Sequence, residues 1–197
     1  MAATGGCATA SDMPPATLFV VIASTRPGRA GGPVAEWFIE CARSHGGFEP
    51  ELVDLRELGL PMMDEPNHPR LGQYVHEHTR AWSAMVERAD AFAFVTPEYN
   101  HGPAPALINA LAYLHAEWAY KPAGIVSYGG VSAGTRSAEI TKGVLTTLKM
   151  VVPPEAVHIP FVAQFVQDGR LVANQPMEDG ATGLLDELRR LCILIHV

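Results

Sequence analysis

Apolar residues recur along the chain at two spacings, and these spacings predict alternating strands and helices. Continuous apolar, β-branched runs predict strands buried on both faces of a parallel sheet, and apolar residues three or four positions apart predict helices. We expect strands at residues 17–23, 48–55, 91–95, 122–127 and 151–160. We expect helices at residues 32–42 (ending near Gly46), 73–88, 103–114, 135–150 and 184–195. A hairpin within residues 162–172, centred on Asp168 and Gly169, is expected at the sheet edge.

This alternation predicts an α/β fold with a doubly wound parallel sheet and helices on both faces. The chain of 197 residues suits one domain with a core of its own. We expect that domain at residues 16–197, after a flexible tail at residues 1–15 that is small, polar and ends in prolines.

Charge and cysteine content narrow the function classes. The formal net charge of -7 disfavours a general nucleic-acid or anionic membrane surface, because both need an excess of Lys and Arg. The cysteines Cys7, Cys41 and Cys192 form no CxxC pair, which favours a reducing compartment without disulfides. No apolar run reaches the roughly 18–20 residues of a membrane helix, and the first residues lack a basic signal-peptide start. We therefore expect a cytoplasmic protein.

Three polar loops rich in Gly and Pro follow the first, third and fourth expected strands. Ligands of doubly wound sheets bind at the carboxyl ends of the strands, so these loops form the candidate site. The first loop offers the hydroxyls of Ser24 and Thr25, the guanidinium groups of Arg26 and Arg29, and backbone N–H groups up to Gly31 and Gly32, where a helix is expected to begin. This combination is typical of a phosphate site.

Two common nucleotide-binding loops are absent from this position. The chain has no GxxxxGK[ST] motif, which disfavours ATP and GTP, and no GxGxxG after the first strand, which disfavours a Rossmann dinucleotide. Asp54, at the end of the second strand, could hold a ribose, but we favour its interpretation as a strand-end acid in a turn.

The second and third loops suit a flat heterocycle. Residues 96–103 combine backbone N–H groups, the amide of Asn100 and the ring of Tyr99, which fit a ring with a polar edge. Residues 127–134 contain Gly129 and Gly130, and glycine lets the backbone approach a ligand closely. The two loops are expected to lie side by side and to line the same ligand.

The segments Ser24-Thr25-Arg26-Pro27-Gly28-Arg29, Thr96-Pro97-Glu98-Tyr99-Asn100-His101-Gly102 and Ser127-Tyr128-Gly129-Gly130 resemble those of the NADPH-dependent FMN reductase family of flavodoxin-like proteins. The resemblance covers about residues 16–161. It implies strand order 2-1-3-4-5, FMN as cofactor, NAD(P)H as co-substrate, and a homodimer or homotetramer. It also implies that the FMN phosphate lies against Ser24, Thr25, Arg26, Arg29 and Gly31, and the isoalloxazine against Pro97, Glu98, Tyr99, Asn100, Ser127, Tyr128, Gly129 and Gly130.

The chain departs from the family pattern at a few positions. Ala23 precedes the first loop where the family usually has Gly, and Gly102 replaces a frequent Ser. Arg29 and Gly31 stand where many members have Ser and Asn. These departures leave the flavin interpretation in place and concern the phosphate contacts and the substrate.

The implied function is ping-pong hydride transfer from NAD(P)H to FMN and then to a quinone, flavin, azo compound or similar small-molecule acceptor. The cofactor carries this chemistry, so no catalytic residue is expected in the protein. One alternative is a non-catalytic electron carrier of the flavodoxin type, which Arg26 and Arg29 disfavour. Another is a flavin-binding redox sensor.

Other chemistry-bearing residues are expected to be structural. A metal chelate at His76 and His78 is disfavoured, because residues two apart on a helix face different ways. Cys41 and Cys192 are expected to pack in apolar helix faces. Trp37, Trp82 and Trp118 are expected in the core or at an interface rather than stacked on the flavin. A dimer seam is expected to include Tyr113, Leu114 and Trp118.

Overall fold

A computed structural model describes residues 14–195 of the chain. The expected tail at residues 1–15 therefore lies almost wholly outside the described residues, as does Cys7. The strands are β1 (Ala16–Ile22), β2 (Phe48–Asp54), β3 (Ala91–Pro97), β4 (Ala123–Tyr128), β5 (Val157–Ile159), β6 (Val166–Gln167) and β7 (Arg170–Leu171). The α-helices are α1 (Gly31–His45), α2 (Leu55–Leu58), α3 (Glu77–Arg88), α4 (Pro105–Ala112), α5 (Thr135–Thr147) and α6 (Gln175–Ile195). Short 3-10 helices are η2 (Pro69–Leu71), η3 (Ala116–Trp118) and η4 (Val162–Gln164).

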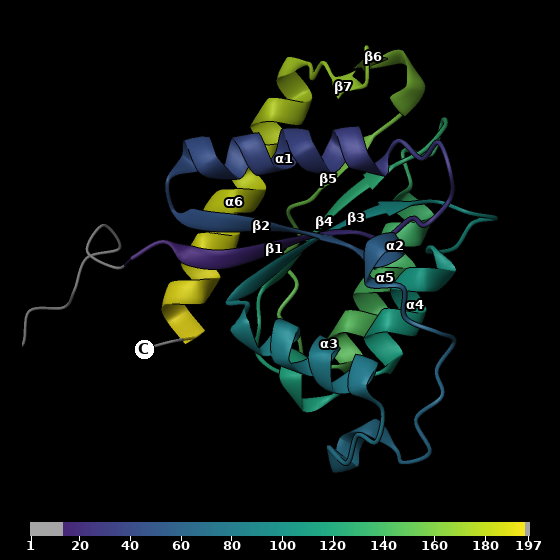
Figure 1. Cartoon of the computed structure of the whole chain (residues 1–197). Helices are drawn as coiled ribbons and strands as arrows, with labels where there is room; N and C mark the ends of the chain where they lie inside the picture. Colours follow the sequence, from purple (N-terminus) through teal and green to yellow (C-terminus); the bar gives the residue numbers. More distant parts are fainter. Residues whose placement is uncertain (1–13, 196–197) are drawn as a thin grey trace, which may run out of the picture.

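Strands β1 to β5 form one parallel sheet in the order β2-β1-β3-β4-β5, which confirms the expected fold (Figure 1). Two hydrophobic clusters cover its faces. One joins the sheet to α1 and α6, and the other joins it to α3, α4 and α5. In Figure 1, α1 lies above the sheet and α3 below it. Because both faces are covered, β3 and β4 are buried at every position, as their continuous apolar sequences predict.

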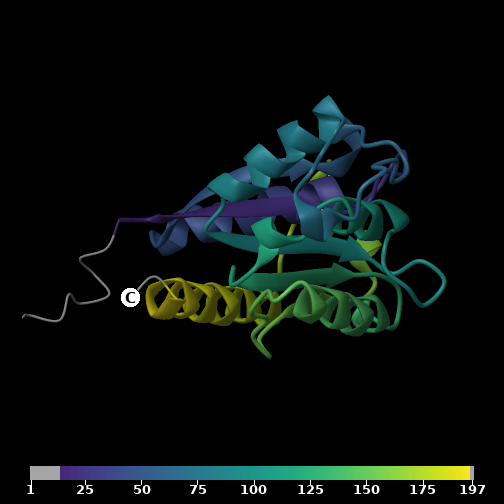
Figure 2. The same ribbon diagram turned by 90° about the horizontal axis from the view of Figure 1, so that it is seen from below.

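The strand register brings the three candidate loops to one edge of the sheet. Ile22 pairs with Val95, and Pro97 pairs with Tyr128, so the chain leaves β1, β3 and β4 on the same side. Figure 2 shows the segment after β3 projecting from the end of the molecule opposite the start of β1 and the end of α6. The sheet thus builds the candidate site at its carboxyl edge.

Several expected boundaries are wrong for local physical reasons. β3 continues through Thr96 and Pro97, because a proline at the end of a strand removes only one donor from the ladder. α6 begins at Gln175, nine residues before its apolar stretch, where Asn174 accepts the amides of Met177 and Glu178. β5 keeps only three of the ten expected residues.

The expected hairpin exists but lies elsewhere. β6 and β7 pair antiparallel, with the turn at Asp168 and Gly169 in left-handed conformation. They form a separate two-stranded sheet and do not extend the parallel sheet, so the prediction of an edge hairpin is wrong. Leu171 packs into the cluster around α1 instead.

The apolar residues expected at a dimer seam are internal. Tyr113, Leu114 and Trp118 have at most 1% of their surface exposed, which contradicts their prediction as subunit contacts. Trp82 packs edge-on against Trp118, and its indole nitrogen donates to the carbonyl of Ala110 at 3.0 Å. These side chains stabilise the hydrophobic cluster that joins the sheet to α3, α4 and α5, as expected for core tryptophans.

Two further expectations about side chains need correction. His76 precedes α3 rather than lying on it, so the rings of His76 and His78 stack at 5.1 Å instead of facing different ways. Within residues 14–195, no group of three or more His, Cys, Asp or Glu could hold a metal ion. Cys192 is buried as expected, but Cys41 is only partly buried and its thiol faces Glu178.

Candidate functional site

The first loop begins with a buried hydroxyl and continues into solvent. Ser24 is fully buried at the end of β1, whereas Thr25 and Arg26 are exposed. The backbone N–H of Arg26 turns back to the Ser24 Oγ at 3.4 Å. Gly28 has a φ of +69°, a conformation that favours glycine, and it lets the loop reverse before α1. The guanidinium of Arg26 has no partner among the described residues, so it is available to an anion.

Arg29, the other expected phosphate ligand, is already engaged. Its Nη2 forms an ion pair with Asp54 Oδ2, and both side chains are largely buried, with 13% and 16% exposed. Asp54 Oδ1 also accepts the N–H of Arg56 at 2.9 Å and so caps α2. This arrangement agrees with Asp54 as a strand-end acid in a turn. It leaves Arg26 as the freer cation of the loop.

The start of α1 has the features of an anion site. Ala30 provides no side-chain cap, and no acidic residue occupies the first turn. The hydroxyl of Tyr128 is buried and has no hydrogen-bond partner among the described residues. It lies so near Gly31 that a Cβ there would be 2.8 Å from it. Buried polar atoms are normally paired, so this hydroxyl and the free N–H groups of the helix end form a cradle for an anion.

The second loop is a tight two-residue turn. Tyr99 and Gly102 exchange two backbone hydrogen bonds, each of 2.9 Å. Asn100 and His101 between them have φ values of 50° and 67°, as a hairpin turn of this hand requires. The hydroxyl of Tyr99 lies 2.5 Å from Ser24 Oγ. The side chain of Tyr99 therefore reaches the first loop, and Asn100 lies at the exposed tip of the turn.

The third loop is held together from inside. Ser127 Oγ donates to the carbonyl of Ala133 at 2.8 Å and lies 2.6 Å from Nδ1 of His158. Burial, and then the charge of Lys142, hold the pKa of His158 below its usual value. A Cβ on Gly129 would be 3.1 Å from the backbone of Gly134, so only glycine fits there without movement. The Ser127 side chain thus supports the loop from inside. The N–H and the carbonyl of Gly129 are bonded to Ile159 and Val162, so among the described residues the N–H of Gly130 is the backbone donor of this glycine pair that is left to a ligand.

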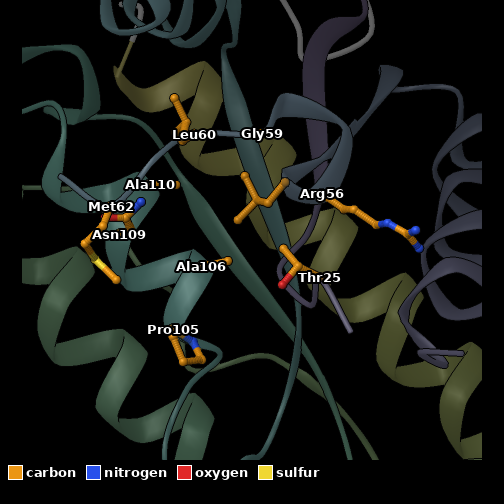
Figure 3. Close-up of a pocket in the computed structure, with 10 residues that line it drawn as sticks. Thr25, Arg56, Gly59, Leu60, Met62, Pro105, Ala106, Asn109 and Ala110 are labelled. Carbon is orange, nitrogen blue, oxygen red and sulfur yellow. The ribbon is translucent and has the colours of Figure 1, made fainter. Parts of the chain in front are cut away.

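A cleft of about 320 Å³ opens beside the first loop (Figure 3). The exposed hydroxyl of Thr25 stands at one side, and α4 forms the opposite wall. The segment between α2 and η2 closes it, held by Asn109, whose amide oxygen accepts from Met63 N at 2.9 Å and whose amide nitrogen donates to Pro61 O at 2.7 Å. The lining residues are Thr25, Leu55, Arg56, Gly59, Leu60, Met62, Pro105, Ala106, Asn109 and Ala110.

The residues that form this cleft, apart from Thr25, were not predicted as site residues. Neither were Arg136 and His158, which support the second and third loops. No sequence motif marks Arg136 or His158, because each of these two residues acts through a contact with a segment more than 30 residues away. For the cleft, the proline-rich stretch at residues 59–69 was the sequence feature that could have indicated a site.

Comparison with known proteins decides what kind of site this is. Residues 16–164 match the sequence pattern of the NADPH-dependent FMN reductase family. The chain belongs to the NADPH-dependent FMN reductase family. This confirms the family that the three loops predicted, together with FMN as the cofactor of that family and NAD(P)H as its reductant.

Individual family relatives cover most of the chain. An NAD(P)H-dependent FMN reductase of Schizosaccharomyces pombe is 42% identical over 139 residues, covering 70% of this chain and 69% of that one. A probable NADPH:quinone oxidoreductase of Oryza sativa subsp. japonica is 34% identical over 145 residues, covering 70% and 72%. The flavoenzyme NAD(P)H:(acceptor) oxidoreductase FerB of Paracoccus denitrificans has the same fold, with a TM-score of 0.71 at 20% identity and coverage of 91% and 98%.

The residues of the cradle fit the phosphate of FMN. A phosphate monoester accepts hydrogen bonds at three oxygens and carries close to two negative charges. The unpartnered Tyr128 hydroxyl and the uncapped end of α1 supply donors, and Arg26 supplies a free positive charge.

Within residues 14–195, no helix is both long and apolar enough to cross a membrane.

Proposed function

We propose that this protein is an FMN-dependent NAD(P)H oxidoreductase that reduces a small acceptor such as a quinone, a free flavin or an azo compound. The observation that carries the proposal is the anion cradle at the start of α1, where the orphaned Tyr128 hydroxyl meets Gly31. The names of the relatives, FMN reductase and quinone oxidoreductase, support the same class of reaction. FMN, when bound, supplies the chemistry of accepting and donating a hydride.

The residues of the chain bind and orient in this proposal. Arg26 and the hydroxyls of Ser24 and Tyr128 hold the phosphate, and the backbone of the second and third loops lies against the ring system. None of these groups has to act as an acid or base. Glu98, the acidic residue nearest the turn, has its carboxylate occupied by Ser132 and Arg136.

We further propose that the cleft beside Thr25 receives the electron acceptor. Leu60, Met62 and Ala106 offer apolar surface to a flat ring, and the Thr25 hydroxyl can donate to a carbonyl oxygen of the acceptor. Ala106→Leu would narrow this cleft. The expected result is a higher KM for menadione, with the dissociation constant of FMN unchanged. An unchanged KM would place the acceptor elsewhere.

The central experiment is an anaerobic titration of the purified, FMN-loaded protein. NADH or NADPH should bleach the flavin absorbance near 450 nm, and menadione should restore it. Steady-state NAD(P)H oxidation with menadione, a free flavin and an azo dye would then rank the acceptors. A protein that does not take up FMN would overturn the proposal. A yellow protein that NAD(P)H fails to bleach would instead favour an electron carrier or a sensor.

A homodimer or homotetramer in the cytoplasm remains part of the proposal. Val131 in the third loop and Phe161 beside it are 81% and 48% exposed, and such apolar side chains at a site edge suit a subunit contact. The cysteine pattern supports a reducing compartment. Light scattering coupled to size-exclusion chromatography would test the assembly, and a monomer at micromolar concentration would count against it.

A further inference from the structure

Glu98 joins the second loop to the start of α5. Its side chain is only 6% exposed, and both carboxylate oxygens are occupied. Oε1 accepts from Nε of Arg136 at 2.7 Å and lies 2.5 Å from its Nη2. Oε2 accepts from Ser132 Oγ at 3.0 Å and from the backbone N–H of Arg136 at 3.3 Å. Burial alone would raise the pKa of Glu98, but the hydrogen bonds from Arg136 and Ser132 hold it below its usual value.

Neighbouring side chains brace the turn from two sides. Tyr99 reaches across to Ser24 in the first loop, whereas Glu98 reaches to Ser132 and Arg136 in the third loop and α5. The turn between Tyr99 and Gly102 holds two non-glycine residues in left-handed conformation, which costs free energy and persists only where surrounding contacts impose it. These two side-chain contacts link the turn to the loops on either side.

We infer that Arg136 is a positioning residue, which holds the turn at residues 99–102 against the flavin ring by fixing Glu98. The inference rests on the proposed function, because that function places the ring against this turn. In this role Arg136 acts through the carboxylate of Glu98 and needs no contact of its own with the ring. Its planar fork binds one oxygen through two nitrogens, a geometry that Lys and Gln do not reproduce.

The affinities for FMN and riboflavin together distinguish a residue that positions the ring-binding turn from one that binds the phosphate. A phosphate ligand contributes to the affinity for FMN and little to that for riboflavin, which has the same ring without the phosphate. A residue that positions the ring-binding turn contributes to both affinities by the same factor. Arg136→Gln should therefore raise the dissociation constants of FMN and riboflavin alike, by about fivefold, as expected for loss of a charged hydrogen bond that is half exposed.

Arg88→Gln is the matched control for the experiment. Arg88 makes a comparable two-nitrogen pair with Glu51, with 57% and 46% of the side chains exposed, and it lies between α3 and β2. The substitution removes the same charge and a two-nitrogen ion pair away from the candidate loops, together with the contact of the Arg88 guanidinium with the Phe19 ring at 5.3 Å. It should leave both flavin affinities unchanged. Arg136→Lys, which keeps the charge but loses the fork, should fall between Arg136→Gln and the unaltered protein.

Hydrogen exchange of the flavin-free protein provides a second measurement. The amides of Tyr99 and Gly102, which are hydrogen-bonded to each other's carbonyls, should exchange faster in Arg136→Gln than in Arg88→Gln, because loss of the contact with Glu98 releases one side of the turn. Equal exchange and equal flavin affinities in the two variants would overturn the inference. An unaltered protein that binds neither flavin would overturn the proposed function instead, and the exchange comparison would still decide whether Arg136 holds the turn.

Discussion

The hydroxyl of Tyr99 lies 2.5 Å from that of Ser24, so a side chain from the second loop contacts the base of the first. Ser24 is fully buried, and its hydroxyl also receives the backbone N–H of Arg26. The turn at residues 99–102 and the first loop are therefore directly connected. A change at one loop should be felt at the other.

Tyr99→Phe tests this connection. The variant keeps the aromatic ring and removes only the hydroxyl, so the Ser24 hydroxyl loses its fixed orientation. We expect the dissociation constant of FMN to rise about fivefold, equivalent to the ~1 kcal/mol net value of a typical hydrogen bond. Quenching of flavin fluorescence measures the change. Unaltered FMN affinity would mean that the Tyr99 hydroxyl makes no contribution to the bound state.

Arg26 and Arg29 should behave differently when each is replaced by Ala. Arg26 is exposed and without a partner among the described residues, so Arg26→Ala should raise the dissociation constant of FMN about tenfold and leave that of riboflavin unchanged. Arg29 is paired with Asp54 in a largely buried contact. Arg29→Ala leaves that carboxylate uncompensated and should lower the free energy of unfolding by about 1–3 kcal/mol.

Arg43→Ala controls for the loss of one positive charge. Arg43 is exposed in the last turn of α1, at the end of the helix opposite the cradle. It should change neither FMN affinity nor stability by much. If Arg26→Ala weakened FMN and riboflavin equally, Arg26 would act on the ring and not on the phosphate. Urea unfolding without flavin separates the effect of Arg29→Ala from ligand binding.

The sequence predicted the site to the level of loops but not of side-chain contacts. The strand order and the meeting of the three loops follow from continuous apolar runs alternating with helices, which local patterns encode. The pairing of Arg29 with Asp54 depends on the register of β1 and β2, which no local pattern specifies. The same holds for Glu98 with Arg136, 38 residues apart. Loop membership was therefore predictable, whereas the division between ligand-facing and supporting residues was not.

Gly31 and Gly32 provide a matched test of the anion cradle. A Cβ on Gly31 would lie 2.8 Å from the Tyr128 hydroxyl and 3.1 Å from Cγ2 of Ile22, whereas a Cβ on Gly32 would meet nothing within 4 Å. Gly31→Ala should therefore displace Tyr128, lower the melting temperature and raise the dissociation constant of FMN about tenfold. Gly32→Ala should leave FMN affinity unchanged.

Adding Tyr128→Phe to Gly31→Ala separates the steric effect from the lost donor. The ring carbon Cζ would be 3.6 Å from the new methyl group, which is an ordinary contact, whereas the 3.1 Å contact with Cγ2 of Ile22 remains, so the melting temperature should recover in part. FMN affinity should stay low, because the hydroxyl proposed to bind the phosphate is gone. Recovery of both would show that Tyr128 serves the fold and contributes nothing to phosphate binding.

The thiol of Cys41 should be unusually slow to react although it is only partly buried. Burial, then the negative charge of Glu178 and the hydrogen bond to its carboxylate, raise the pKa of Cys41 to about 12. Because the thiolate is the reactive form, alkylation by iodoacetamide should speed up about tenfold per pH unit between about pH 8 and 10 without levelling off. Glu178→Gln removes the charge, so it should lower the pKa and accelerate alkylation, whereas the exposed Glu36→Gln on the same helix as Cys41 should not. Peptide mass spectrometry would assign the rate to Cys41, and a rate that levels off near pH 9 would contradict the role given to Glu178.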